Sequence, residues 1–109
     1  MSYLKFLNLL EAVKGLPTFP AIDAVEERLL NTFAVLWQAG APVSVLQAME
    51  MLDKTSPATV HRRLKTLRKK GFIALEMDKT DNRVKFIVST PLTNQYFAKL
   101  EDCLAKAQE

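Results

Sequence analysis

The chain has 109 residues, 49% of them hydrophobic, which is enough for one compact domain with a single core. Its only cysteine, Cys103, excludes an intramolecular disulfide and fits a reducing cytoplasm. The net charge is only +3, but Pro57–Gly71 carries six basic residues and no acid, so the rest of the chain sums to −3. A basic segment on a near-neutral body is typical of proteins that bind a polyanion.

Several classes of protein are excluded by missing sequence motifs. The apolar stretch Phe6–Leu10 is too short and too interrupted for a signal peptide or a membrane span. No glycine-rich phosphate loop, H-E-x-x-H, C-x-x-C or G-x-S-x-G motif is present, so nothing indicates an enzyme. His61 is the only histidine and has no neighbours at metal-ligand spacing. We therefore expect no metal, no cofactor, no membrane association and a cytoplasmic location.

Ser2–Lys14 is predicted to be the first helix, ended by the Gly15-Leu16-Pro17 segment. Its apolar residues recur at helical spacing: Leu4, Leu7, Leu10 and Val13, with Phe6 and Leu9 beside them. So broad an apolar face on a short helix must be covered. The cover is either the core of the same domain or a second subunit, and the sequence leaves both open.

A second helix is predicted over Pro20–Ala39 and ends at Gly40. Asp23 and Glu26 stand at capping-box spacing, or simply add acids near the helix N-terminus. The predicted apolar face consists of Ile22, Val25, Leu29, Phe33 and Leu36.

Two further helices follow, joined by a short turn. The first is predicted over Ser44–Asp53, with a capping box from Ser44 and Gln47. Its predicted inner face consists of Leu46, Met49 and Leu52. Ser56 then caps the second helix, which has Pro57 in its first turn and Gly71 at its end. Two helices joined by a tight turn, the second of them basic, form a helix-turn-helix pattern.

The basic helix divides into two faces when projected at roughly 100° per residue. Val60, Leu64 and Leu67 cluster toward the core, and Arg62, Lys65 and Lys69 fall on the opposite side. A solvated charged face is the simpler interpretation, but such a face usually carries acids at i,i+4 spacing, and this helix has none. The favourable position of Lys69 and Lys70 at the negative end of the helix dipole explains part of the charge.

The rest of the chain is predicted to form a β-hairpin and a last helix. Phe72–Met77 and Val84–Ser89 alternate apolar and polar residues around a short polar segment. Thr93 is expected to cap a helix that runs to Gln108. Its predicted apolar face consists of Phe97, Leu100, Leu104 and Ala107, with Tyr96 and an inert Cys103 beside it.

This order of elements resembles the winged-helix domain, and most closely the MarR family of bacterial transcriptional regulators. The similarity is carried by S-P-A-T-V-H-R-R-L-K-T-L-R-K-K-G-F-I at Ser56–Ile73, D-K-T-D-N-R at Asp78–Arg83 and S-T-P-L-T at Ser89–Thr93. It implies an α+β, mostly α fold: a winged helix-turn-helix with a three-helix core, a hairpin wing and flanking terminal helices. We expect one domain over 1–109, with a core at 20–92 between flanking helices at 2–14 and 93–108.

The resemblance also implies a set of DNA-binding residues. On the basic helix, the matching positions approach bases and phosphates in the major groove, and Lys69 extends the same face. These residues are Ser56, Ala58, Thr59, His61, Arg62, Lys65 and Lys69. On the wing, Arg83 would reach the minor groove together with Lys79, and Asp81 would support Arg83, either for binding or as a turn salt bridge. These side chains suit that role, because arginine binds guanine or phosphate through a planar fork and a narrow minor groove attracts it.

The sequence therefore predicts sequence-specific binding to double-stranded DNA and regulation of transcription, with repression as the expected direction. A homodimer through the terminal helices would bind two half-sites. A small-molecule effector is compatible with this fold, but no residue identifies one. Two alternatives stay open: a winged-helix module that binds another protein, and a nucleic-acid-binding protein of replication or maintenance.

Overall fold

The computed structural model describes residues 2–108, which form two compact units. The helix–hairpin unit is Ile22–Thr90 and contains α2 (Ala24–Gln38), α3 (Val45–Ala48), α4 (Pro57–Lys70), β1 (Ile73–Met77) and β2 (Lys85–Ser89). The terminal-helix unit consists of residues 2–21 and 91–108, with α1 (Ser2–Lys14) and α5 (Pro91–Ala107). The expected core at 20–92 has nearly the limits of the helix–hairpin unit. The expectation of a single domain stays a prediction.

The core of the helix–hairpin unit lies between the three helices and the sheet. The predicted inner residues of α4 are buried: Val60, Leu64 and Leu67. They pack in one core with Leu29, Leu30, Phe33, Phe72 and Ile87. The Trp37 indole N–H donates to the Ile87 carbonyl at 3.1 Å, which joins α2 to the hairpin.

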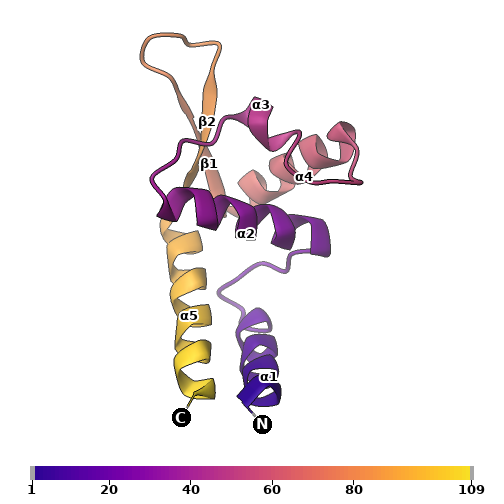
Figure 1. Ribbon diagram of the computed structural model, residues 1–109, viewed down its shortest axis with the longest axis vertical. Helices are drawn as coiled ribbons and strands as arrows, with labels where there is room; N and C mark the ends of the chain where they lie inside the picture. Colours follow the sequence, from indigo (N-terminus) through magenta and orange to yellow (C-terminus); the bar gives the residue numbers. More distant parts are fainter. Residues whose placement is uncertain (1, 109) are drawn as a thin grey trace. The chain divides into compact units, whose positions relative to one another are not determined.

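The hairpin is a two-stranded antiparallel sheet in which Ile73 pairs with Ser89 and Met77 with Lys85. In Figure 1 its loop projects beyond α3. The segment before α3 adds a short third edge, because Ser44 bridges Phe86 and the Ile87 N–H donates to the Val43 carbonyl at 2.7 Å. The fold is therefore the predicted one, mostly helical with a hairpin wing.

Two predicted helices in this unit had wrong limits. The helix predicted from Pro20 begins at Ala24, because Asp23 is its N-cap and closes a capping box with Glu26. The helix predicted over Ser44–Asp53 has only one turn: Ser44 and Gln47 form the expected box, but α3 ends at Ala48. That single turn directs Ala48 inward, so Leu46 is 79% exposed rather than on the inner face. Both strands begin one residue later than predicted.

In the terminal-helix unit, α1 and α5 pack side by side (Figure 1). The helix α1 has the predicted limits, and its Val13 is buried. The last helix begins at Pro91 rather than Thr93, because proline suits the first helical turn. Its predicted apolar face was right for Ala107, which is buried, but wrong for Leu104, which is 49% exposed. The residues of α5 that are buried are Thr93, Tyr96, Cys103 and Ala107.

Candidate nucleic-acid interface

The first turn of α4 holds three of the predicted site residues in one hydrogen-bonded chain. The Ser56 hydroxyl accepts from the Thr59 backbone N–H at 3.2 Å and lies 2.9 Å from the Thr59 hydroxyl. That hydroxyl in turn accepts from Nη2 of Arg62 at 3.4 Å. The N-cap thus fixes the start of the helix and also orients the Arg62 guanidinium along its outer surface.

The outward side of α4 carries the other predicted residues of this helix. All of them are exposed except the half-buried Thr59: Ser56, Ala58, His61, Arg62, Lys65 and Lys69. Val60, Leu64 and Leu67, on the other side, are buried. The helix therefore presents cations to solvent along one side, as the sequence projection predicted.

Two of the six basic residues of α4 serve the fold instead. Nε of Arg63 lies 2.9 Å from Oδ2 of Asp23. Lys70 Nζ donates to both carboxylate oxygens of Glu26, at 2.8 and 2.9 Å. Both carboxylates belong to the capping box of α2, so these ion pairs join the N-terminus of α2 to α4.

Glu26 is the centre of this link, although its position in the sequence predicted only a role in the cap of α2. Its side chain is 1% exposed, and it also accepts from the Thr66 hydroxyl at 2.8 Å and from the Asp23 N–H at 2.9 Å. A buried carboxylate needs such partners, because an unpaired one is costly. In the sequence, a glutamate on the apolar side of a predicted helix was the available signal.

The remaining basic residues of α4 make no ion pair within residues 2–108: Arg62, Lys65, Arg68 and Lys69. The helix thus separates its charge into a neutralised inner part and an unneutralised outer part. Because anions are attracted only by the second part, the outer face has the electrostatic character of a polyanion-binding surface.

The hairpin loop holds Arg83 at its tip. Nε and Nη2 of Arg83 donate to Oδ1 and Oδ2 of Asp81 at 3.0 and 3.2 Å, and the Arg83 backbone N–H donates to Oδ1 at 3.1 Å. These bonds, the side-chain bond first, hold the pKa of Asp81 below its ordinary value. The Arg83 side chain is nevertheless 87% exposed, and Lys79 is exposed in the same loop. The expected contact between Asp81 and Arg83 is present.

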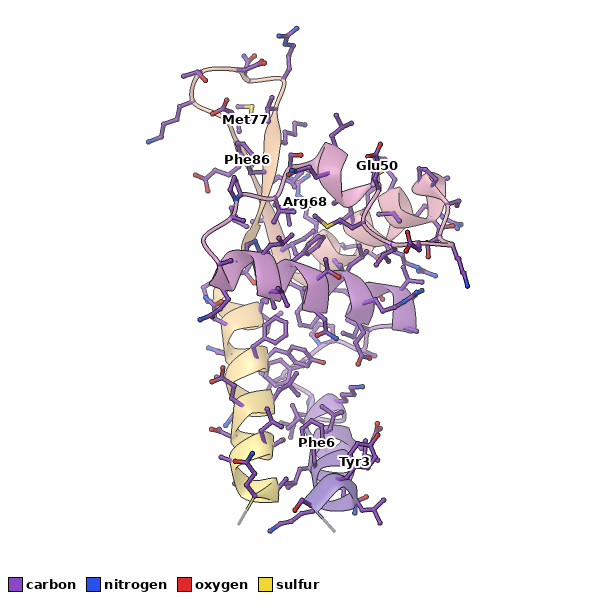
Figure 2. The ribbon with its side chains drawn as sticks, in the orientation of Figure 1. Tyr3, Phe6, Glu50, Arg68, Met77 and Phe86 are labelled. Carbon is purple, nitrogen blue, oxygen red and sulfur yellow. The ribbon has the colours of Figure 1, made fainter. Side chains whose placement is uncertain are left out.

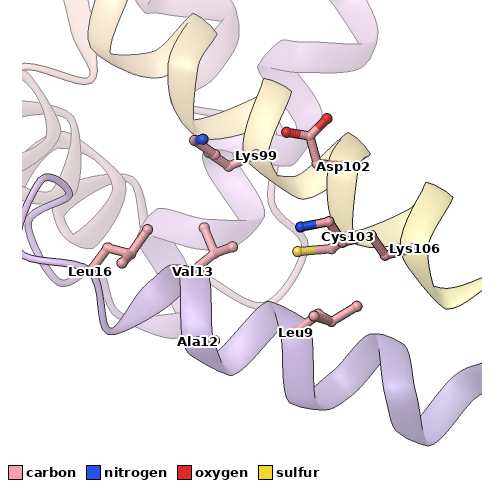
Figure 3. A pocket seen from close by; sticks show the side chains of 8 residues that line it. All are labelled: Leu9, Ala12, Val13, Leu16, Lys99, Asp102, Cys103 and Lys106. Atoms are coloured by element: carbon pink, nitrogen blue, oxygen red, sulfur yellow. The ribbon is translucent and has the colours of Figure 1, made fainter.

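The terminal-helix unit has its own small pocket of about 240 Å³ between α1 and α5 (Figure 3). Leu9 and Val13 of α1 and Cys103 of α5 line it, together with Lys99, Asp102 and Lys106 of α5. Cys103 is 4% exposed. Within residues 2–108, no cluster of three potential metal ligands is found, and no helix is long and apolar enough to span a membrane.

The geometry defines a class of protein: a capped, outwardly cationic helix followed by a hairpin with an exposed arginine is a winged-helix DNA-binding domain. The family described as the LexA DNA binding domain matches residues 25–83, more than half of the chain. The chain therefore belongs to this family. No curated protein matches it significantly.

Solved structures similar to the chain include a heme sensor protein, a MarR-like transcriptional regulator and a protein–DNA complex. The heme sensor protein PefR from Streptococcus agalactiae, in complex with heme, is 25% identical, with a TM-score of 0.64 over 95% of this chain and 65% of PefR. A MarR-like transcriptional regulator from Thermotoga maritima is 19% identical, with a TM-score of 0.63 over 97% of this chain and 77% of its own. The MepR–DNA complex of S. aureus is 21% identical, with a TM-score of 0.62 over 97% and 73%.

These likenesses confirm the predicted resemblance to MarR-like regulators, and the matched proteins are regulators rather than enzymes. At sequence identities of 19% and 21%, the similarity to the Thermotoga maritima and S. aureus structures supports the fold alone. The chain spans just under two thirds of the length of PefR.

Proposed function

We propose that the chain binds double-stranded DNA sequence-specifically and regulates transcription in the cytoplasm, with repression as the expected direction. One observation carries the proposal: within residues 2–108, four of the six cations of α4 make no ion pair, while Arg63 and Lys70 are neutralised by Asp23 and Glu26. A charged surface that serves only solubility would not require this separation, because exposed ion pairs add little to the stability of a protein.

In this proposal α4 lies in the major groove and the hairpin tip at the neighbouring minor groove. Arg62, aligned by Thr59, contacts a base edge, with Ala58 and His61 beside it. The α4 N-terminus at Ser56 and the side chains of Lys65 and Lys69 bind phosphates. At the tip, Lys79 and Arg83 bind in or beside the minor groove, with Asp81 holding Arg83 in place.

The proposed assembly is a homodimer of single-domain chains, joined through the terminal helices. Its support is the apolar surface left exposed on them: Tyr3 is 66% exposed, Leu4 54% and Leu104 49%. Figure 2 labels Tyr3 on α1. Large apolar side chains that stay exposed can mark a protein interface. A two-fold dimer would bind two half-sites about one helical turn apart.

Selection of bound duplexes from a random DNA pool tests the proposal directly. A two-fold symmetric motif is the expected result. With that motif, Arg62→Ala should weaken binding by roughly 1–3 kcal/mol and relax preference at one base position. The matched control is Arg28→Ala, because Arg28 is also exposed but lies on α2. No binding to any duplex at low salt would refute the proposal and favour the protein-binding alternative.

A further inference from the structure

A second surface feature lies within the helix–hairpin unit, where α4 faces the sheet. It is a pocket of about 230 Å³ with an apolar floor that includes Leu64 and Leu75. Four basic residues line it: His61, Lys65 and Arg68 from α4, and Lys85 from β2. Figure 2 labels Arg68 between α4 and the hairpin, and Arg68 lines the pocket together with Leu75 and Lys85. Neither Arg68 nor Lys85 is among the DNA-binding residues predicted from the sequence.

The sheet register explains why Lys85 faces the helix. Lys85 pairs with Met77, and Leu75 with Ile87. Directly paired residues share a face of an antiparallel sheet, and alternate residues along a strand return to that face. Lys85 therefore lies on the same side as Leu75 and Ile87, the side that packs toward α4. The hairpin thus contributes a cation, Lys85, to a pocket whose other basic residues all belong to α4.

The charge of this pocket is uncompensated. None of its lining residues is acidic, and within residues 2–108 neither Arg68 nor Lys85 makes an ion pair. Arg63 and Lys70 of the same helix, in contrast, are paired with carboxylates. Long basic side chains can lay their alkyl stems over an apolar floor and keep their charged ends in water. Arg68 and Lys85 can therefore hold two cationic groups at the rim.

The geometry of the DNA grooves indicates which part of a duplex would lie between Arg68 and Lys85. The major and minor grooves of a duplex are separated by one sugar–phosphate backbone. A protein with α4 in one groove and the hairpin tip in the next must therefore straddle that backbone. The cleft between α4 and the hairpin is the place where the strand would run, and its cations match the charge of the strand.

We propose that this cleft seats the phosphates of the DNA strand that separates the two grooves, with Arg68 and Lys85 as phosphate contacts on either side. This inference rests on the proposed DNA binding and extends it to two residues. Phosphate contacts set register and orientation without reading sequence. Arg68 and Lys85 therefore contribute affinity that is independent of sequence, unlike Arg62.

The test measures binding of Arg68→Gln and Lys85→Gln by fluorescence anisotropy, on the selected motif and on a random duplex, over a range of salt concentrations. Losing one phosphate contact should lower the slope of log K against log salt by about 0.9 and weaken binding about fivefold at 0.15 M salt, with convergence near 1 M. The factor should be the same for both duplexes. Arg28→Gln removes the same charge from α2 and should leave the slope unchanged.

A methylphosphonate scan adds a positional readout. Neutralising the phosphate in the cleft should weaken wild-type binding, should have a smaller effect on Lys85→Gln, and should have no further effect on the Arg68→Gln/Lys85→Gln double variant, because both contacts are then lost. Absence of wild-type binding would overturn the proposed function itself. Normal wild-type binding with an unchanged salt slope in both variants would overturn only the proposed phosphate contacts of Arg68 and Lys85. A loss confined to the selected motif would show base reading instead, and would also overturn it.

Discussion

The buried ion pair between Glu26 and Lys70 should make the two partners unequal under mutation. Glu26 is 1% exposed, whereas the Lys70 side chain is 30% exposed. Lys70→Met leaves a buried carboxylate without its cation, while Glu26→Gln leaves an ammonium group that can turn toward water. Glutamine also keeps an acceptor oxygen for the Asp23 N–H or for Thr66. Lys70→Met should therefore cost more stability than Glu26→Gln.

The magnitude follows from the geometry. Removing one partner of a buried pair typically costs 3–5 kcal/mol. Three hydrogen-bond donors reach the Glu26 carboxylate, and two of them, from Asp23 and Thr66, survive in Lys70→Met. We therefore expect about 3 kcal/mol for Lys70→Met and about 1–2 kcal/mol for Glu26→Gln. The double variant should recover part of the loss, because neither group is then left as an unpaired charge.

Urea unfolding followed by Trp37 fluorescence suits this test, because Trp37 is the only tryptophan and lies in the helix–hairpin unit. Lys69→Met is the matched control: it removes the same charge from the adjacent, exposed position and should change stability by less than about 0.5 kcal/mol. A cost below about 1 kcal/mol for Lys70→Met, or equal costs for both single variants, would show that the pair does not hold α4 in the way proposed.

Three further predictions concern the cap, the wing and the dimer. Ser56→Ala removes the N-cap of α4 and should cost about 1 kcal/mol of unfolding free energy, and circular dichroism on urea titration measures it. Arg83→Ala should weaken DNA binding while leaving unfolding nearly unchanged, and NMR titration should show the pKa of Asp81 rising toward its ordinary value of 3.8. In the wild type, this ion pair is present above the ordinary carboxyl range and is lost as pH falls through the lowered pKa of Asp81. Leu104→Glu should convert the proposed dimer to monomer in sedimentation velocity; an unchanged mass would contradict the terminal-helix interface.

Local signals in the sequence predicted the elements that frame the interface. Ser56 and Pro57 mark the start of a helix and Gly71 marks its end, and α4 has the limits that these residues indicate. Gly71 adopts a φ of 90°, the left-handed conformation that glycine favours at a helix end. The inward face of α4 was equally predictable, because a helix with a single apolar face turns that face toward the core.

The short helix α3 shows where such local signals fail. Apolar spacing at Leu46, Met49 and Leu52 indicated a helix to Asp53, yet the helix ends after one turn. The chain then turns through Lys54, a residue with a φ of 64°. A three-residue apolar repeat cannot distinguish a helix from a turn whose side chains meet the core, so tertiary packing decides.

The division of charge on α4 needed tertiary structure for another reason. Arg63 and Lys70 look like their neighbours in the sequence, and their partners Asp23 and Glu26 lie about 40 residues away. Counting cations therefore overestimates the binding surface. If every basic residue of α4 met a phosphate, the helix would contribute about 5.4 to the salt slope, whereas the four that make no ion pair within residues 2–108 allow at most about 3.6. The Arg63–Asp23 and Lys70–Glu26 ion pairs hold α4 against the N-terminus of α2. The other cations of α4 are then available to bind DNA. The same basic run thus serves both the fold and the function, through opposite sides of one helix.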